Sequence, residues 1–548
     1  MGRRHTLHGI LDVIGGTHPD GMLRAGSPRV PLVAWKTMSW SRFRRLIQIL
    51  VLAAFAWLTV GGPSLGRAWL PTGPLSRLDP LVGLSAVLAS RGFVAFWAVA
   101  LLTIALTVVF GRVWCGWICP LGTVLEIVPL PAKLHRSVSR SWRLGKYVTL
   151  AIVLGAALIG NLGPMILDPV TIVTRPLQEL ARPFIGSDAI GQSIGASLGW
   201  DALHAVALLS LLPLVVVLAL NLVGSRFWCR NLCPLGGLLA LVSKAPGVRR
   251  RVQTDACTSC ARCAKVCPTG AITREEGFAS STAECITCLS CVDACKAGAD
   301  GFAFSASQVL APGYEPSRRD ALVAMGATGL CLAAGVLPIA RTHAEILRPP
   351  STSEERLAEL CVRCGACYGA CPTGSLRPSV SFTSEAGPWT PMLDERLAHC
   401  TLKCNRCAAP CPTDALHTPT PQEAKALGLG VKAEVDRARC RAWARNHTCM
   451  QCQRVCPIAG ALVGEGRPAG LPSPNGDEPV QVPVVDKNLC VGCNLCATAC
   501  VMAPAAIGAP LPRTGAATPA TSGMPFRMPG LRSMPRAPST GKGAPKPK

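Results

Sequence analysis

Aromatic residues are scarce in this sequence, at 5% of its 548 residues, although 49% of the residues are hydrophobic. The apolar content comes mainly from alanine, leucine and valine, a composition typical of membrane helices. Mean hydropathy is positive, at +0.34, which is unusual for a soluble protein. The length allows several domains, and we expect at least one of them to contact a lipid bilayer.

Three cofactor signatures are missing. No Cys-x-x-Cys-His segment occurs, which argues against covalent haem, and His204 is the only histidine within the long apolar runs. No glycine-rich dinucleotide motif follows a strand. The segment 325–328, Met-Gly-Ala-Thr, has only a faint similarity to a covalent flavin site and lies inside an apolar run. We therefore expect neither haem nor flavin.

Basic residues outnumber acidic ones, 55 to 31, but they are not massed on a candidate recognition helix, so we expect no nucleic-acid partner. Many flank apolar stretches, as on the cytoplasmic side of membrane spans. These flanks predict a helical membrane bundle of four spans, a fifth signal-anchor-like span and a cytoplasmic N-terminus. Each span needs about 20 residues, and the candidates are Leu46–Val60, Phe93–Phe110, Lys146–Leu162, Leu203–Val223 and Ala321–Ile339.

Two segments of the chain repeat each other. RVWCGWICPLG at 112–122 and RFWCRNLCPLG at 226–236 each follow an apolar run and carry a Cys-x3-Cys-Pro motif. A parallel repeat of helix pairs would bring the motifs together, which predicts a set of four thiols: Cys115, Cys119, Cys229 and Cys233. Four thiolates suit an iron–sulfur cluster or another soft-metal centre. A redox-active dithiol and simple packing at helix ends are the alternatives.

Each repeat also contains an Asp-Pro pair, in LDPLVGL at 78–84 and LDPVTIV at 167–173. Aspartate followed by proline is a favourable N-cap and first turn, so helix capping is the main expectation for Asp79 and Asp168. The second is acceptance of a proton from a quinol. These two residues and the four repeat cysteines are the candidate catalytic residues.

Two runs of cysteines after the repeat have the C-x2-C-x2-C-x3-C spacing of a bacterial two-cluster ferredoxin. In that motif the fourth cysteine of each run ligates the other cluster. The predicted ligand sets are Cys257, Cys260 and Cys263 with Cys295, and Cys285, Cys288 and Cys291 with Cys267.

Four further runs follow the fifth apolar stretch, two of them with a longer first gap. Zinc sites favour separated cysteine pairs, and disulfides need no recurring Cys-Pro ending, so we favour [4Fe–4S] clusters over zinc or a disulfide scaffold. The runs are Cys361, Cys364, Cys367, Cys371; Cys400, Cys404, Cys407, Cys411; Cys440, Cys449, Cys452, Cys456; and Cys490, Cys493, Cys496, Cys500. All six runs together predict six clusters, and Cys331 remains as a packing residue.

Arg318 and Arg319 precede the fifth apolar stretch in the layout of a twin-arginine export signal; an ordinary helix with basic flanks is the alternative.

The predicted segments are a cytoplasmic N-terminus (1–45), the four-span domain (46–245), a cytoplasmic two-cluster ferredoxin (246–310), the signal-like segment and fifth span (311–345), a periplasmic four-cluster ferredoxin (346–505) and a disordered basic tail rich in proline and alanine (506–548).

With these motifs, residues from about 40 to 300 resemble the NapH/MauN membrane ferredoxins, and those from about 315 to 505 resemble the NapG/MauM ferredoxins. The resemblance implies a quinol dehydrogenase module of the bacterial inner membrane. It would pass electrons from the membrane quinol pool to a periplasmic reductase or its small electron carrier, with nitrate reductase as the best-known client. The fusion, the long gap after Cys440 and two missing prolines depart from the pattern.

The NapG/MauM resemblance also implies how the four C-terminal runs share clusters, the outer two with each other and the inner two likewise. Carried over, the sets are Cys361, Cys364, Cys367 with Cys500; Cys490, Cys493, Cys496 with Cys371; Cys400, Cys404, Cys407 with Cys456; and Cys440, Cys449, Cys452 with Cys411.

A second function competes with quinol oxidation. Similar membrane architecture occurs in accessory proteins for nitrous oxide reduction and copper-oxidase assembly. The chain would then supply electrons for the maturation, reactivation or regulation of a periplasmic metalloenzyme. The four C-terminal cluster motifs favour continuous electron transfer.

Iron content tests the cysteine analysis. Six [4Fe–4S] clusters would bring about 24 iron atoms per chain, and a further centre at the repeat cysteines would add to that number. Iron and zinc should be measured on anaerobically purified protein by elemental analysis. Iron near 8 atoms per chain, roughly two clusters, with zinc in the remaining sites, would contradict the assignment.

Overall fold

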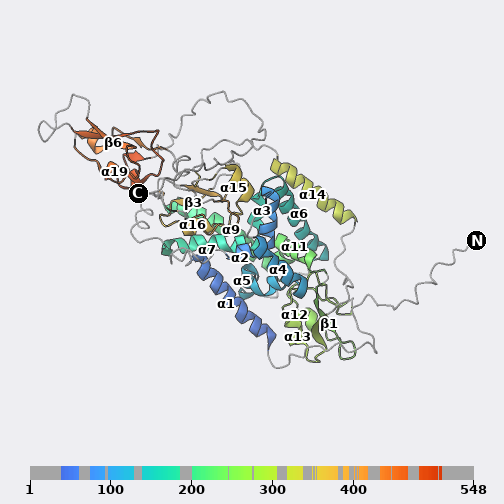
Figure 1. The fold of residues 1–548 in the computed structure, drawn as a ribbon. Helices are drawn as coiled ribbons and strands as arrows, with labels where there is room; N and C mark the ends of the chain where they lie inside the picture. Colours follow the sequence, from blue (N-terminus) through green and yellow to red (C-terminus); the bar gives the residue numbers. More distant parts are fainter. Residues whose placement is uncertain are drawn as a thin grey trace, which may run out of the picture. The chain divides into compact units, whose positions relative to one another are not determined.

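The computed structural model describes residues 39–60, 74–92, 97–128, 139–185, 200–304 without 245, 275 and 276, 318–336 and, with gaps, 348–416 and 432–508. Helices dominate its first half (Figure 1). They are α1 (Trp40–Val60), α2 (Pro74–Arg77), α3 (Pro80–Ser90), α4 (Trp97–Phe110), α5 (Pro120–Ile127), α6 (Gly145–Leu158), α7 (Pro169–Ile185), α9 (Trp200–Val223), α10 (Phe227–Asn231) and α11 (Pro234–Val242). Short helical turns are η1 (Trp114–Ile118), η3 (Arg140–Leu144) and η4 (Gly163–Leu167).

The predicted bundle of membrane spans is wrong. In the part of the chain that the structure describes, no helix has both the length and the apolar character needed to cross a bilayer. Two of the predicted spans form helices of only 14 residues, α4 and α6, against about 20 for a span. The longer α1 carries arginines in its first turns, at Arg42, Arg44 and Arg45.

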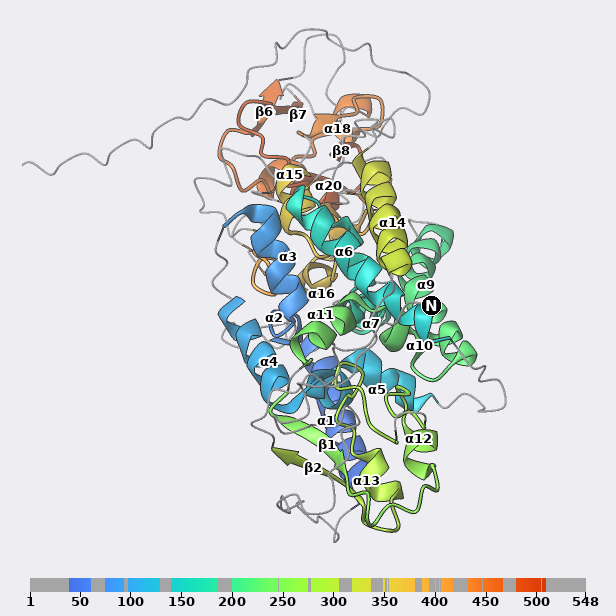
Figure 2. The ribbon, with the colours of Figure 1, turned by 90° about the vertical axis from the view of Figure 1, so that its right-hand side faces the viewer.

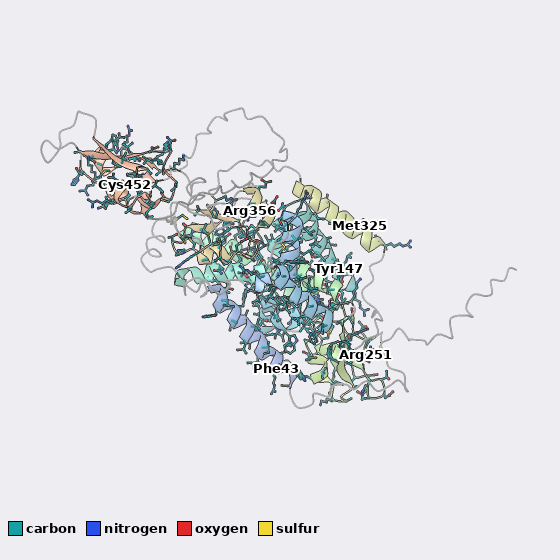
Figure 3. The ribbon with its side chains drawn as sticks, in the orientation of Figure 1. Phe43, Tyr147, Arg251, Met325, Arg356 and Cys452 are labelled. Atoms are coloured by element: carbon teal, nitrogen blue, oxygen red, sulfur yellow. The ribbon has the colours of Figure 1, made fainter. Side chains whose placement is uncertain are left out.

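The fifth stretch forms α14 (Arg318–Val336), whose first three residues are Arg318, Arg319 and Asp320. The helix packs beside α6 (Figure 2). Large apolar side chains cover its outer surface, and Met325, 71% exposed, points away from the other helices (Figure 3). The twin-arginine interpretation of its first residues stays a prediction, and the end of the predicted fifth span and the C-terminal tail lie outside the described residues.

The duplication predicted from the sequence is visible in the order of the elements. Asp79 is the N-cap of α3, and Asp168 directly precedes α7. Farther on, Cys119 is the N-cap of α5 and Cys233 is the N-cap of α11, each followed by proline at the first helical position. Both repeats therefore use one pattern, in which Asp-Pro starts one helix and Cys-Pro starts a later one.

A small ferredoxin domain follows the repeats. Its strands β1 (Val248–Val252) and β2 (Asp300–Phe304) pair antiparallel, with Arg250 opposite Phe302, and its helices are α12 (Arg262–Val266) and α13 (Ser290–Ala294). We call residues 246–304 the first ferredoxin. It contacts the preceding helical repeats through the loop before α13, where Trp117 Nε1 of η1 donates to the carbonyl of Thr287 at 3.0 Å.

Two more units of this kind are present among the described residues from 354 to 508. The middle ferredoxin (354–416) has α15 (Glu354–Leu360), α16 (Ala366–Ala370), and the antiparallel pair β3 (Leu376–Pro378) and β4 (Pro391–Leu393). The last ferredoxin (432–508) has β5 (Glu434–Val435) paired with β8 (Ile507–Gly508), β6 (Leu462–Gly466) paired with β7 (Gln481–Val485), and α18 (Arg441–Ala444), α19 (Gln451–Arg454) and α20 (Leu495–Thr498). The predicted small ferredoxin-type domains are thus present.

The close approach of Gly116 to the first ferredoxin gives a stability test. A Cβ atom at Gly116 would lie 2.2 Å from the carbonyl oxygen of Ile286, whereas one at Gly326 in α14 would meet nothing within 4 Å. We expect Gly116→Ala to lower the free energy of unfolding by about 1–3 kcal/mol through overpacking. Gly326→Ala, the matched control, should raise it slightly, by at most about 1 kcal/mol. Anaerobic denaturant titration would measure both, and equal stabilities would contradict this packing.

Candidate iron–sulfur sites

The first ferredoxin brings its cysteines together in the two predicted sets. One cavity is lined by Cys257, Cys260, Cys263 and Cys295. A second is lined by Cys267, Cys285, Cys288 and Cys291. The structure therefore places the fourth cysteine of each run with the first three of the other run, as the motif predicts.

The surroundings of these thiols fit a cluster. The backbone N–H of Ala271 donates to Cys267 Sγ at 3.3 Å. At Cys260 the backbone N–H of Arg262 is the largest influence and lowers the pKa of the thiol. Donors of this kind favour the thiolate, which is the form that binds iron, and they also tune the cluster potential. Among the described residues no three His, Cys, Asp or Glu side chains stand close enough to hold a single metal ion.

The middle and last ferredoxins group their cysteines differently from the prediction. Cys371 lines a cavity with Cys400, Cys404 and Cys407. Cys500 lines another with Cys440, Cys449 and Cys452. The two remaining groups are visible in the packing: Cys411 contacts the same hydrophobic cluster as Cys361 and Cys367, and Cys456 contacts the same cluster as Cys490 and Cys496. Burial raises the pKa of Cys364, with a further contribution from Cys411, and burial raises the pKa of Cys493, with one from Cys456.

The pairing of outer with outer and inner with inner runs is therefore wrong. The structure groups cysteines of neighbouring runs instead, so that each C-terminal unit repeats the arrangement of the first ferredoxin. The physical reason is loop closure: joining Cys367 to Cys411 closes a much shorter loop than joining it to Cys500, at a smaller entropic cost. The list of candidate ligands is unchanged, since all sixteen cysteines lie in one of these four groups.

The four repeat cysteines also meet, as predicted, and we call Cys115, Cys119, Cys229 and Cys233 the core cysteine set. Three of them are buried in the largest hydrophobic core, and Cys229 packs against it. Burial raises the pKa of Cys233 well above its usual value, and Cys229, Cys115 and Cys119 raise it further. Four thiols this close in an apolar core need positive charge beside them to become thiolates.

Two buried arginines supply that charge. Arg112 lies beside Cys115 and Cys233, and Arg226 beside Cys229. Each arginine reaches across to the other repeat: a Cβ at Gly236 would lie 2.9 Å from Arg112 Nη2, and one at Gly122 would lie 3.4 Å from Arg226 Nη1. The glycine of each Cys-Pro-Leu-Gly motif thus leaves room for the arginine of the opposite motif.

Two glutamates hold these arginines in place. Glu284 of the first ferredoxin lies 2.5 Å from Lys146 Nζ and 3.5 Å from Arg112 Nη1. Glu126 of α5 bonds Arg226 at 2.7 Å and Arg44 of α1 at 2.5 Å. Burial would raise the pKa of Glu126, but the hydrogen bond from Arg44 and the charges of both arginines outweigh it and lower that pKa to about 2. Glu126 is therefore ionised at neutral pH.

The sites form a continuous series. The core that contains Cys115 and Cys119 also contains Cys288 of the first ferredoxin and Cys364 of the middle one. Tyr368 and its apolar neighbours pack between the two sites of the middle ferredoxin, touching Cys367, Cys371 and Cys400. The backbone N–H of Cys400 then donates to the carbonyl of Cys493 in the last ferredoxin at 3.1 Å.

Sequence reasoning missed the contact that attaches the middle ferredoxin to the repeats. Arg175 of α7 is 1% exposed, and its Nε and Nη2 both donate to the carbonyl of Arg363 at 3.1 Å. Its guanidinium lies over the ring of Trp389, 4.8 Å from the centroid. Nothing in the local sequence of α7 distinguishes this arginine from the others that flank apolar runs.

Comparisons with known proteins identify 4Fe-4S domains in this chain. A 4Fe-4S binding domain model matches residues 92–137 and 206–253, a 4Fe-4S dicluster domain model matches 239–309, and a further 4Fe-4S binding domain model matches 356–377. The first of these covers both Cys-x3-Cys-Pro motifs.

The ferredoxin-type protein MauN of Methylorubrum extorquens is 31% identical over 276 residues, which are 47% of this chain and 82% of MauN. The chain belongs to the MauN/NapH family of ferredoxin-type proteins. NapH of Haemophilus influenzae is 28% identical over 48% of the chain and 88% of its own length. MauM of Methylobacillus flagellatus is 35% identical over 30% of the chain and 68% of its own length. No solved structure matches. The chain therefore joins a MauN/NapH-type part to a MauM-type part.

The revised pairing can be tested with three serine variants. Cys411→Ser should remove the same cluster as Cys361→Ser, because the structure groups these cysteines, and leave the last ferredoxin intact. Cys500→Ser should instead alter the site of Cys440, Cys449 and Cys452. Electron paramagnetic resonance of the reduced proteins would distinguish the clusters. If Cys500→Ser and Cys361→Ser lost the same signal, the grouping in the structure would be refuted.

Proposed function

We propose that this iron–sulfur electron-transfer protein oxidises quinol at its MauN/NapH-type part and passes the electrons through its MauM-type part to a reductase or small carrier. The supporting observation is the position of the core cysteine set, which shares one hydrophobic core with a cysteine of each adjoining ferredoxin. [4Fe–4S] clusters bound at these cysteines would supply reversible one-electron chemistry.

The charges around the core cysteine set favour the arrival of an electron there. Arg112 and Arg226 are buried beside the thiols, in surroundings where a charge interaction is stronger than in water. Negative charge added to this site is therefore stabilised, which raises its reduction potential. Their partners Glu284 and Glu126 keep both guanidinium groups fixed, so little reorganisation accompanies the change in charge.

Quinol dissolves in lipid, so the proposal includes contact with a membrane surface. The described helices expose large apolar side chains, among them Leu50 and Trp57 of α1, Leu102 of α4 and Leu212 of α9, each more than half exposed. Exposed apolar surface on this scale marks interaction sites with membranes or proteins. We propose that this exposed apolar surface contacts lipid. For the electron acceptor, a periplasmic reductase of the nitrate reductase type is the first candidate to examine.

The alternative, an electron donor for maturation of a metalloenzyme, is less well supported. The unbroken series of sites from Cys288 to Cys493 suits sustained electron flow. A maturation protein would need only enough electrons to repair one client at a time.

The core cysteine set provides the test of the proposal. Cys115→Ser and Cys229→Ser should each reduce quinol-dependent reduction of the C-terminal clusters by about 100-fold or more, and the double variant should be no worse, because groups that act as a unit are not additive. The rate should be followed by absorbance after adding a soluble quinol analogue to anaerobic protein.

Cys331→Ser is the matched control, since Cys331 lies outside every cysteine motif, and it should leave the rate unchanged. Wild-type rates in Cys115→Ser and Cys229→Ser would show that the core cysteine set is not on the path. If those variants also accumulated an inactive client enzyme in the cell, the maturation function would replace the proposal.

A further inference from the structure

The two repeat aspartates meet inside the protein. Asp79 and Asp168 are both fully buried. Asp79 Oδ1 accepts from the backbone N–H of Leu81 at 2.8 Å, and Asp168 Oδ2 accepts from those of Val170 and Thr171 at 3.0 and 2.9 Å. Capping, the main expectation from the sequence, thus occupies one oxygen of each carboxyl group.

The second oxygen of each carboxyl group accepts no capping hydrogen bond. Asp79 Oδ2 and Asp168 Oδ1 are buried and have no donor among the described residues. The two side chains nevertheless lie within hydrogen-bonding reach of each other. Two ionised carboxylates cannot bond to each other because both are acceptors. A single proton between them would satisfy both oxygens.

The balance of charge around the pair also favours one proton shared by the two carboxyl groups. Each carboxyl group lies at a helix N-terminus, which carries about half a positive charge, so two such ends offset about one negative charge. Burial raises the pKa of Asp79 well above its usual value, and the charge of Asp168 raises it further. Burial also raises the pKa of Asp168.

The cations on neighbouring elements are engaged elsewhere. Arg44 of α1 bonds Glu126 of α5, and Lys146 of α6 bonds Glu284. Arg77 of α2 donates to the carbonyl of Ala409, and Arg175 of α7 to that of Arg363. Arg356 of α15 donates to the carbonyls of Asp414 and Ala415. The neighbouring acid that acts on each aspartate is the other aspartate, and the charge of Asp168 in turn contributes to raising the pKa of Cys119, the N-cap of α5.

We propose that Asp79 and Asp168 form a proton-binding site that holds one proton and takes up a second when an electron enters the core cysteine set. The second half rests on the proposed function. In this step a reductant supplies one electron to the core cysteine set and the solvent supplies one proton. The aspartate pair changes from one negative charge to none, which offsets the negative charge added nearby.

Infrared difference spectroscopy tests the site directly. The oxidised protein at pH 7 should show the C=O stretch of one buried protonated carboxyl group, and dithionite reduction should increase its intensity about twofold as the pair gains its second proton. Asp79→Asn and Asp168→Asn should each lose the band. Asparagine keeps the capping oxygen and supplies an N–H to its partner, so both variants should fold.

Asp293→Asn is the matched control, because Asp293 is an exposed carboxylate that accepts from the N–H of Ser41, and it should leave the band unchanged. Absence of the band in the wild type, or its persistence in both asparagine variants, would overturn the shared proton. A band that does not grow on reduction would overturn the link to the core cysteine set. Dithionite replaces quinol here, so the result is independent of whether quinol is the physiological donor.

Discussion

Burial of four thiols in one apolar core is the constraint on which the rest of this structure depends. Thiolates cannot be held there without positive charge, and Arg112 and Arg226 are the buried cations beside them. Buried arginines need acceptors in turn. Glu284 brings the first ferredoxin against the repeats, and Glu126 brings α1 against α5. The charges that prepare the core cysteine set therefore also assemble the domains around it.

Duplication explains why these features occur in pairs. Each repeat contributes one aspartate, two cysteines and one arginine, and each arginine fits over the glycine of the other repeat. Neither repeat could complete the core cysteine set or the aspartate pair alone. The MauM-type part is attached to this duplicated unit through Arg175, whose interaction with the carbonyl of Arg363 and the ring of Trp389 orients the middle ferredoxin on α7.

The spacing of the cysteines in the first ferredoxin predicted which of them lie together. The apolar composition of the first half, in contrast, led to the wrong prediction of membrane spans. The tight loops of the first ferredoxin leave their cysteines few alternatives, so both ligand sets there could be predicted. Hydropathy could not show that the predicted span 146–162 ends early: α6 stops at Leu158, and a turn follows at Gly160 with φ of +77°. The pairing in the C-terminal half was inferred from resemblance alone, and Arg175 has no local signal.

The buried thiols and the buried carboxyl groups both lie at helix N-termini. Cys119 and Cys233 cap α5 and α11, where the N–H of Gly236 donates to Cys233 Sγ at 3.3 Å, and Asp79 caps α3. The positive end of a helix stabilises negative charge within its first turn. In each repeat one such end lies at a thiol and another at a carboxyl group. Helix N-termini therefore stabilise negative charge both at the core cysteine set and at the aspartate pair. A proton that binds to the pair removes its negative charge, and so reduces the electrostatic repulsion between the pair and an electron at the core cysteine set.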